Sequence, residues 1–76
     1  RKLDEFDPET PVQVMSVFER DRRLLEYLDN LGVRPGARLR VVARNYDDTI
    51  TLAIEDATVP LGNSAAARIW AERVQD

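Results

Sequence analysis

The 76-residue sequence contains no cysteine and no histidine. Without cysteine the chain can form no disulfide, and it offers no thiolate for metal binding, redox chemistry or nucleophilic attack. Its serine and threonine hydroxyl groups have no histidine to activate them. The composition therefore argues against an enzyme and favours an intracellular protein.

Glycine, long apolar runs and positive charge are also scarce. The three glycines form no phosphate-binding pattern, and no apolar run approaches the roughly 18 residues of a membrane span. The net charge of −3 argues against a dedicated nucleic-acid binder. A local basic stripe is the alternative, because four arginines lie on or beside one predicted strand, and we interpret it as a solvated face: Arg34, Arg38, Arg40 and Arg44.

Residues 24–43 show the clearest pattern in the sequence. Leucines recur at helical spacing, which predicts an amphipathic helix over about 21–31. Asp21 is placed to cap its first turn and Gly32 to close its last. Pro35 and Gly36 have the signature of a type II turn, and alternating residues then predict a strand over 38–44.

Four further strands and a helical turn follow from the same rules. The first strand, 12–18, alternates throughout only if it carries a bulge near Met15 or Ser16. Pro60 should lie on a sheet edge. The other predicted elements are strands at 49–54, 57–61 and 69–74 and a helical turn at about 64–68. So many short strands with one inserted helix predict a mainly β fold, a small five-stranded SH3-like barrel. An open sheet covered by the helix is the alternative.

Residues 1–11 are acidic and contain two prolines, with only Leu3 and Phe6 apolar. This composition predicts a linker or disordered arm, leaving residues 12–76 as the domain. Because the sequence begins with Arg1 rather than Met, we expect it to be a piece of a longer chain.

Two places in the sequence are candidates for ligand contact. Glu19 and Asp21 flank the first strand-to-helix junction, where oxygens could converge on a divalent cation. The alternative is that Asp21 caps the helix and Glu19 is a surface charge. Tyr46 and Trp70 could line a peptide-binding groove, although a single tryptophan in a last strand is at least as often part of the core.

The spacing of caps and turns also resembles a known family. The residues concerned are Phe18-Glu19-Arg20-Asp21, the run 31–41 (LGVRPGARLRV), Leu61-Gly62, and Ala65 to Ala67 with Ile69-Trp70. Over about 12–74 they are similar to a FeoA-like domain, in particular to the one that ends metal-dependent repressors of the diphtheria toxin repressor and manganese transport regulator family. The acidic arm is similar to the linker in those repressors.

The resemblance implies a cytoplasmic SH3-like domain without activity of its own, attached to an Fe(II)- or Mn(II)-sensing repressor. It implies contacts with other domains of the same chain, such as a proline-containing linker, with DNA bound only through a missing N-terminal domain of a homodimer. In iron-type repressors this domain contributes a Glu and, three residues later, a Gln to an ancillary metal site. Those positions fall on Ser16 and Glu19 in this sequence. The resemblance therefore implies Glu19 as the one plausible metal ligand, with Asp21 as its neighbour.

Three functions therefore remain open. The first is a regulatory interaction domain of a metal-dependent repressor, with no cofactor in the isolated domain and Fe(II) or Mn(II) in the full-length protein. The second is a free-standing FeoA-like accessory protein of ferrous iron transport. The third is an SH3-like module that binds peptide or RNA and is unrelated to metals. The sequence upstream of Arg1 would distinguish them.

Overall fold

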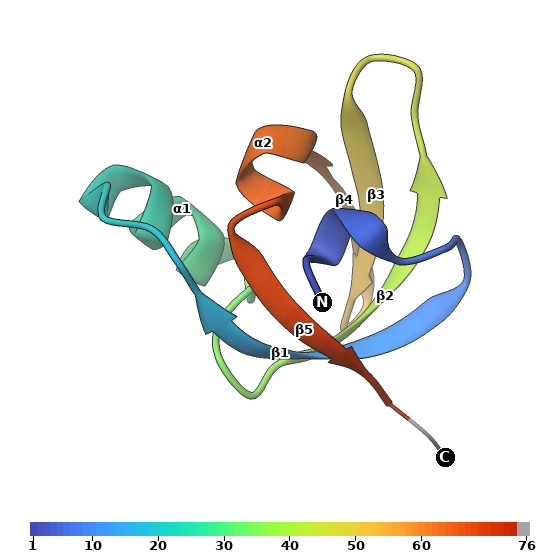
Figure 1. Cartoon of the computed structure of the whole chain (residues 1–76), viewed down its shortest axis with the longest axis horizontal. Helices are drawn as coiled ribbons and strands as arrows, with labels where there is room; N and C mark the ends of the chain where they lie inside the picture. Colours follow the sequence, from blue (N-terminus) through green and yellow to red (C-terminus); the bar gives the residue numbers. More distant parts are fainter. Residues whose placement is uncertain (75–76) are drawn as a thin grey trace.

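The computed structural model describes residues 1–74. Within this range there are five strands, two α-helices and one 3-10 helix (Figure 1). In chain order they are η1 (Leu3–Glu5), β1 (Thr10–Val17), α1 (Arg22–Leu31), β2 (Arg38–Arg44), β3 (Thr49–Ile54), β4 (Ala57–Gly62), α2 (Asn63–Ala66) and β5 (Ile69–Arg73). None of the described helices is long and apolar enough to cross a membrane.

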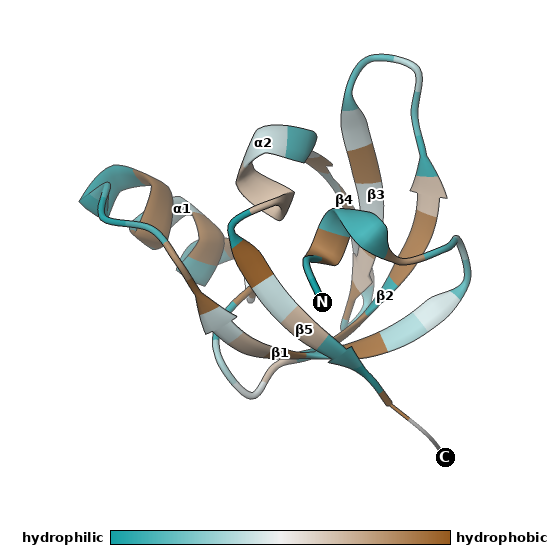
Figure 2. Ribbon diagram, viewed as in Figure 1, coloured by the Kyte–Doolittle hydropathy of each residue, from teal (hydrophilic) through white to brown (hydrophobic). Residues whose placement is uncertain are grey.

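The strands form one antiparallel sheet in the order β4-β3-β2-β1-β5. The sheet curls on itself (Figure 1), and apolar residues recur along its strands (Figure 2). The core that it encloses takes side chains from every strand and from both ends of the chain. Val12, Leu52 and Ile69 are completely buried there, and no polar residue of the described range is buried. The prediction of a mainly β, five-stranded SH3-like barrel with one inserted helix is thus confirmed.

Helix α1 begins and ends as its sequence indicates. The Asp21 side chain accepts the backbone N–H of Arg23 at 2.9 Å. At the other end Gly32 takes a φ of 91°, and the N–H of Val33 reaches back to the carbonyl of Leu28 at 2.8 Å, completing a Schellman motif. Leu28 is the only buried residue of the helix, so α1 projects from the barrel on a narrow contact (Figure 1).

The Pro35-Gly36 turn fixes how α1 leads into β2. Gly36 has a φ of 91°, and the N–H of Ala37 bonds to the carbonyl of Arg34 at 3.0 Å, which is type II geometry. The turn is also bonded to β1, since Val14 donates to the carbonyl of Ala37 at 2.8 Å and accepts from Gly36 at 2.7 Å. The turn therefore attaches β1 to the start of β2.

Both long strands are irregular. The register of β1 with β5 shifts between Val14 and Ser16, which confirms the predicted bulge. The register of β2 with β3 shifts between Val41 and Ala43. Leu39 and Val41 are buried, but Ala43 is only half-buried, because this second irregularity breaks the alternation at Val42.

Strand β4 lies on a sheet edge and carries Pro60 there, as expected. Its inner face is short, because Leu61 is buried and Val59 half-buried while Ala57 is exposed beside the hairpin turn. That turn is tight despite lacking glycine: Ile54 pairs with Ala57, and Glu55 takes a φ of 55°.

The second helix differs from its prediction in position. Helix α2 spans Asn63–Ala66 rather than about 64–68, and its N-cap is Gly62, with no side-chain hydrogen bond. Neither the Asn63 nor the Ser64 side chain caps this turn. Packing holds this single turn, with Ala66 completely buried.

The prediction that residues 1–11 form an unpacked arm differs from the structure. Leu3 is 0% exposed and Phe6 4% exposed, and both belong to the core. Arg1 exchanges two backbone hydrogen bonds with Ala71, at 2.7 and 2.9 Å, and the Arg44 guanidinium donates to the carbonyls of Asp4 and Phe6. The segment is ordered because the barrel supplies the apolar surface that the segment lacks.

We expect Leu3→Ala to lower the free energy of unfolding by about 2–5 kcal/mol, the usual cost of truncating a fully buried leucine. Urea denaturation of the 76-residue chain measures the change. Leu25→Ala is the matched control and should cost less, because Leu25 is partly exposed on α1. If the Leu3 variant were as stable as wild type, the N-terminal segment would not be part of the core.

The two glycines with positive φ provide a matched pair of variants. Alanine at either position adopts a left-handed conformation at a cost of roughly 1–2 kcal/mol. At Gly32 the added Cβ would also lie 3.0 Å from Cγ2 of Ile54, whereas at Gly36 it would meet nothing within 4 Å. Thermal melts should therefore show Gly32→Ala below Gly36→Ala, and both below wild type. The reverse order would show that the α1 C-terminus does not press on β3.

Candidate functional site

The junction between β1 and α1 is organised by the carboxylate of Glu19. One oxygen, Oε1, accepts the backbone N–H groups of Arg20 at 2.7 Å and Asp21 at 3.0 Å. The other, Oε2, accepts the guanidinium of Arg68, which follows α2. The Glu19 side chain is only 9% exposed. It therefore joins the β1–α1 connection to the segment before β5.

These contacts change the acidity of the carboxyl group. The pKa of Glu19 lies below its ordinary value of 4.5, first because the backbone N–H of Asp21 donates to the carboxylate. The Arg68 guanidinium is the next cause, followed by the backbone N–H of Arg20. All three favour the charged form, so the hydrogen bonds and the negative charge support each other.

The other residues considered as metal ligands also have structural roles. Asp21 uses Oδ1 to cap α1, which is the alternative weighed from the sequence. Ser16 lies in β1 beyond the bulge, opposite Trp70. Within residues 1–74 there is no group of three or more acidic side chains arranged to hold a metal ion. A cation reaching Glu19 Oε2 would have to displace Arg68.

The basic strand face is largely engaged by the chain's own acceptors. Arg34 pairs with Asp29 at 3.4 Å, and Arg40 pairs with Glu9 at 3.8 Å. Arg44 is bound to backbone carbonyls of the N-terminal segment. These contacts agree with our interpretation of a solvated face, because few of these guanidinium groups are free to follow a phosphate backbone.

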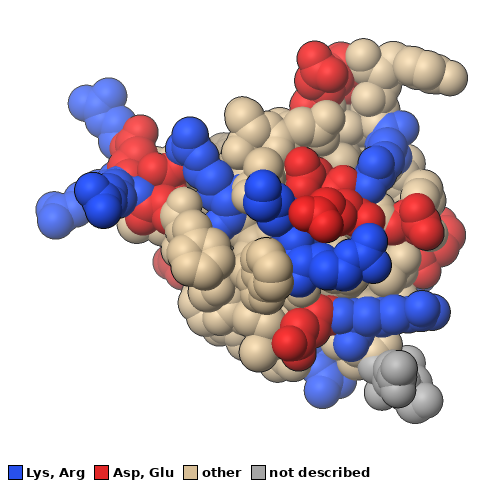
Figure 3. All heavy atoms as spheres, in the orientation of Figure 1, with Lys and Arg blue, Asp and Glu red and all other residues tan. Residues whose placement is uncertain are grey.

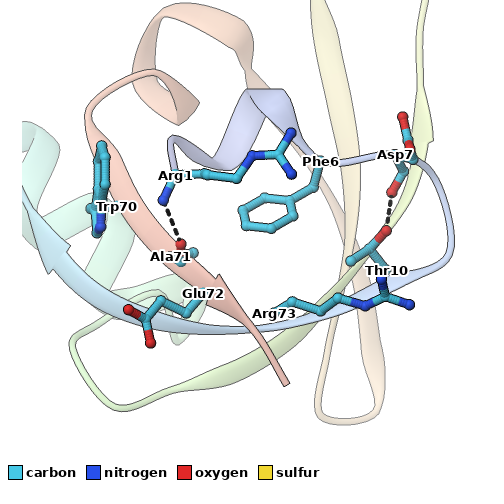
Figure 4. Close-up of a pocket in the computed structure, with 8 residues that line it drawn as sticks. All are labelled: Arg1, Phe6, Asp7, Thr10, Trp70, Ala71, Glu72 and Arg73. Carbon is cyan, nitrogen blue, oxygen red and sulfur yellow. Dashed lines mark hydrogen bonds between the residues drawn. The ribbon is translucent and has the colours of Figure 1, made fainter. Parts of the chain in front are cut away.

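The structure does not bring Tyr46 and Trp70 together in one groove. Tyr46 lies fully exposed in the loop between β2 and β3. Trp70 is 42% exposed on β5 and borders a pocket of about 330 Å³ that Tyr46 does not line (Figure 4). The pocket lies against the N-terminal segment, with the Arg1 guanidinium 5.2 Å from the centre of the Phe6 ring.

Sequence reasoning missed two features of this region. It did not find Arg68 as the partner of Glu19, because 49 positions separate them and no local pattern connects the two. It also did not single out Met15 and Phe18, which lie exposed near Trp70. The bulge in β1, which the alternation of valines had indicated, could have predicted that Phe18 is exposed, because it reverses the alternation before that residue.

The lowered pKa of Glu19 predicts a pH-dependent contribution to stability. Because the unfolded chain holds this proton more tightly, the contribution is complete above about pH 4.5 and is lost as the pH falls through the lowered pKa. Between about pH 6 and pH 3, Glu19→Gln should therefore lose less stability than wild type. Denaturation at each pH measures this. Glu26→Gln, on the exposed side of α1, is the control and should follow the wild-type profile. If Glu19→Gln lost as much stability over this pH range as wild type, the contribution would not come from Glu19.

Comparison with solved structures finds close matches to this fold. A manganese-dependent transcriptional repressor is 33% identical and superimposes with a TM-score of 0.88, over 97% of this chain and 41% of that chain. Iron(II) transport protein A from Clostridium thermocellum is 25% identical, with a TM-score of 0.88 over 97% of this chain and 46% of that one. The chain thus spans less than half of either protein. A search of curated protein sequences found no match.

A third structure has nearly the same length as this chain. It is an iron uptake regulatory protein, FeoA, 19% identical with a TM-score of 0.84, covering 96% of this chain and 94% of that one. At this identity the likeness concerns the fold. The family model of the FeoA domain matches residues 1–73, which include the N-terminal segment and all five strands. The chain therefore belongs to the FeoA domain family.

Proposed function

We propose that this FeoA domain is the C-terminal regulatory domain of a metal-dependent, DNA-binding transcriptional repressor, and that it acts through contacts with other domains of its own chain. One observation carries the proposal: the manganese-dependent repressor is 33% identical over nearly the whole of this chain, yet the chain covers only 41% of that protein. Such a repressor would have room for DNA-binding and dimerisation domains before a domain of this size.

The chemistry of the described residues supports a role in contact rather than in sensing. Glu19 and Asp21 are engaged by backbone N–H groups and by Arg68. We therefore assign Fe(II) or Mn(II) binding to the rest of a cytoplasmic, homodimeric repressor. Metal ligation by Glu19 and Asp21 stays a prediction, and it requires ligands from another domain together with movement of Arg68. Catalysis is not part of this proposal.

A second candidate is a free-standing accessory protein of ferrous iron transport. The observation that favours it is the iron uptake regulatory protein FeoA, whose length this chain nearly matches. The repressor is preferred because its sequence identity is higher, 33% against 19%. The two candidates differ in what precedes residue 1, so the intact mass of the native protein distinguishes them.

The proposal is tested on the full-length protein with genomic fragments that it selects in the presence of Mn(II). The full-length protein should retard these fragments only with Mn(II) or Fe(II), and residues 1–76 alone should not, even at about 50 mM salt, where phosphate contacts are strong. Residues 1–76 should also show no saturable Mn(II) binding at micromolar concentrations by titration calorimetry. A native protein without further domains would overturn the proposal.

The variant Arg38→Glu plus Arg40→Glu provides the control for DNA contact by this domain. Both arginines are exposed on the outer face of β2. Since we place DNA binding outside this domain, the variant should leave the full-length gel shift unchanged. A salt-sensitive complex with residues 1–76, lost in this variant, would assign DNA binding to the domain itself.

A further inference from the structure

Three large apolar side chains are exposed where β1 and its first following residue pair with β5. Met15 is 46% exposed, Phe18 67% and Trp70 42%. Ser16, between the first two, is the cross-strand partner of Trp70, and the N–H of Phe18 bonds to the carbonyl of Arg68 at 2.7 Å. We call these three residues the β1–β5 patch. Neighbouring exposed apolar residues of this size are typical of interaction sites.

The bulge in β1 creates this patch. Val12 and Val14 are buried, so a regular strand would also direct Ser16 and Phe18 inward. The register shift after Val14 reverses the alternation: Val17 packs against the core and Phe18 is exposed. The bulge therefore places an aromatic side chain on the surface, beside Met15, at a position where a regular strand would bury it.

Positive charge borders part of the β1–β5 patch, whereas Glu72, two residues beyond Trp70 on the same face of β5, contributes a carboxylate. Lys2 forms an isolated bridge with Trp70, Arg20 follows Phe18 by two residues, and Arg68 is held by Glu19. Lys2 and Arg20 have no ion-pair partner among residues 1–74. Figure 3 shows uncharged surface on the face that carries β5, with both Lys or Arg atoms and Asp or Glu atoms along its border. Beside Lys2 and Arg20 the patch is therefore complementary to an apolar surface that carries carboxylates at its edge.

The N-terminal end of the described chain lies next to this surface. The backbone of Arg1 pairs with Ala71, which is adjacent to Trp70 (Figure 4). In a longer chain the residues that precede Arg1 therefore begin beside the β1–β5 patch. A domain joined through a short connection would have a high effective concentration at this surface.

We infer that the β1–β5 patch is the surface on which the preceding domain of the same chain docks, and that the docking face of that domain is apolar with acidic residues at its edge. This inference rests on the proposed function and adds the location and chemistry of the contact. In the proposed repressor the chain enters this domain beside the patch, and for that reason we name the preceding domain as the occupant. A second copy of this domain is the competing occupant.

Oxidative footprinting of the full-length protein tests the inference, because Met15 and Trp70 are the only methionine and tryptophan in residues 1–76. Their peptides report the patch directly by mass spectrometry. Both residues should oxidise several-fold more slowly in the full-length protein than in the 76-residue chain. Tyr46, fully exposed on a distant loop, is the internal control and should oxidise equally in both.

Phe18→Asp in the full-length protein should remove the protection of Met15 and Trp70, because it places a carboxylate in an apolar contact opposite other carboxylates. Tyr46→Asp is the matched control and should leave the protection intact. Thermal melts of both variants as 76-residue chains check that these exposed positions do not affect folding.

Three outcomes would overturn the inference, and they differ in what else they reject. Equal oxidation in a full-length protein that has a preceding domain rejects the docking surface but keeps the proposed function. Protection that grows with the concentration of the 76-residue chain assigns the patch to a second copy. An intact native mass without a preceding domain rejects the inference and the proposed function together.

Discussion

The fold depends on the hydrogen bonding of β1 along both of its edges. Residues 10–13 pair with β2 and residues 12–17 pair with β5, so Val12 and Gln13 are paired on both sides. Val14 additionally exchanges backbone hydrogen bonds with the Pro35-Gly36 turn. Because β2 and β5 are far apart in sequence, β1 is the segment that joins the two parts of the sheet. The bulge lies within this strand, so it influences the core and the outer surface together.

Local rules predicted much of the domain. Asp21, Gly32 and the Pro35-Gly36 turn each act through neighbours a few residues away, and the structure places them as the sequence indicated. The bulge in β1 was also predictable, because Val12 and Val14 could share a face with Val17 only if the register shifted. In each case the information lies within one turn or one strand.

The remaining features required knowledge of distant partners. Residues 1–11 contain too few apolar side chains to form a core of their own, so their composition predicted an arm. Leu3 and Phe6 are nevertheless buried, because they pack against apolar side chains of the barrel. The ion pair of Glu19 with Arg68 depends on how α2 and β5 meet the β1–α1 junction, and neither residue signals the other. The sequence placed Glu19 at the junction between a strand and a helix. It did not predict the hydrogen bonds from Arg20, Asp21 and Arg68 that the Glu19 carboxylate accepts there.

The two edges of the sheet differ in how their backbone groups are covered. On β4, Pro60 has no N–H to offer to another strand. On β5, the first two residues of the chain already bond to Trp70 and Ala71. An additional strand from another molecule would therefore meet an interrupted donor row on one side and an occupied one on the other. This arrangement protects a small, strand-rich domain against edge-to-edge aggregation while leaving its side-chain surface free for specific contact.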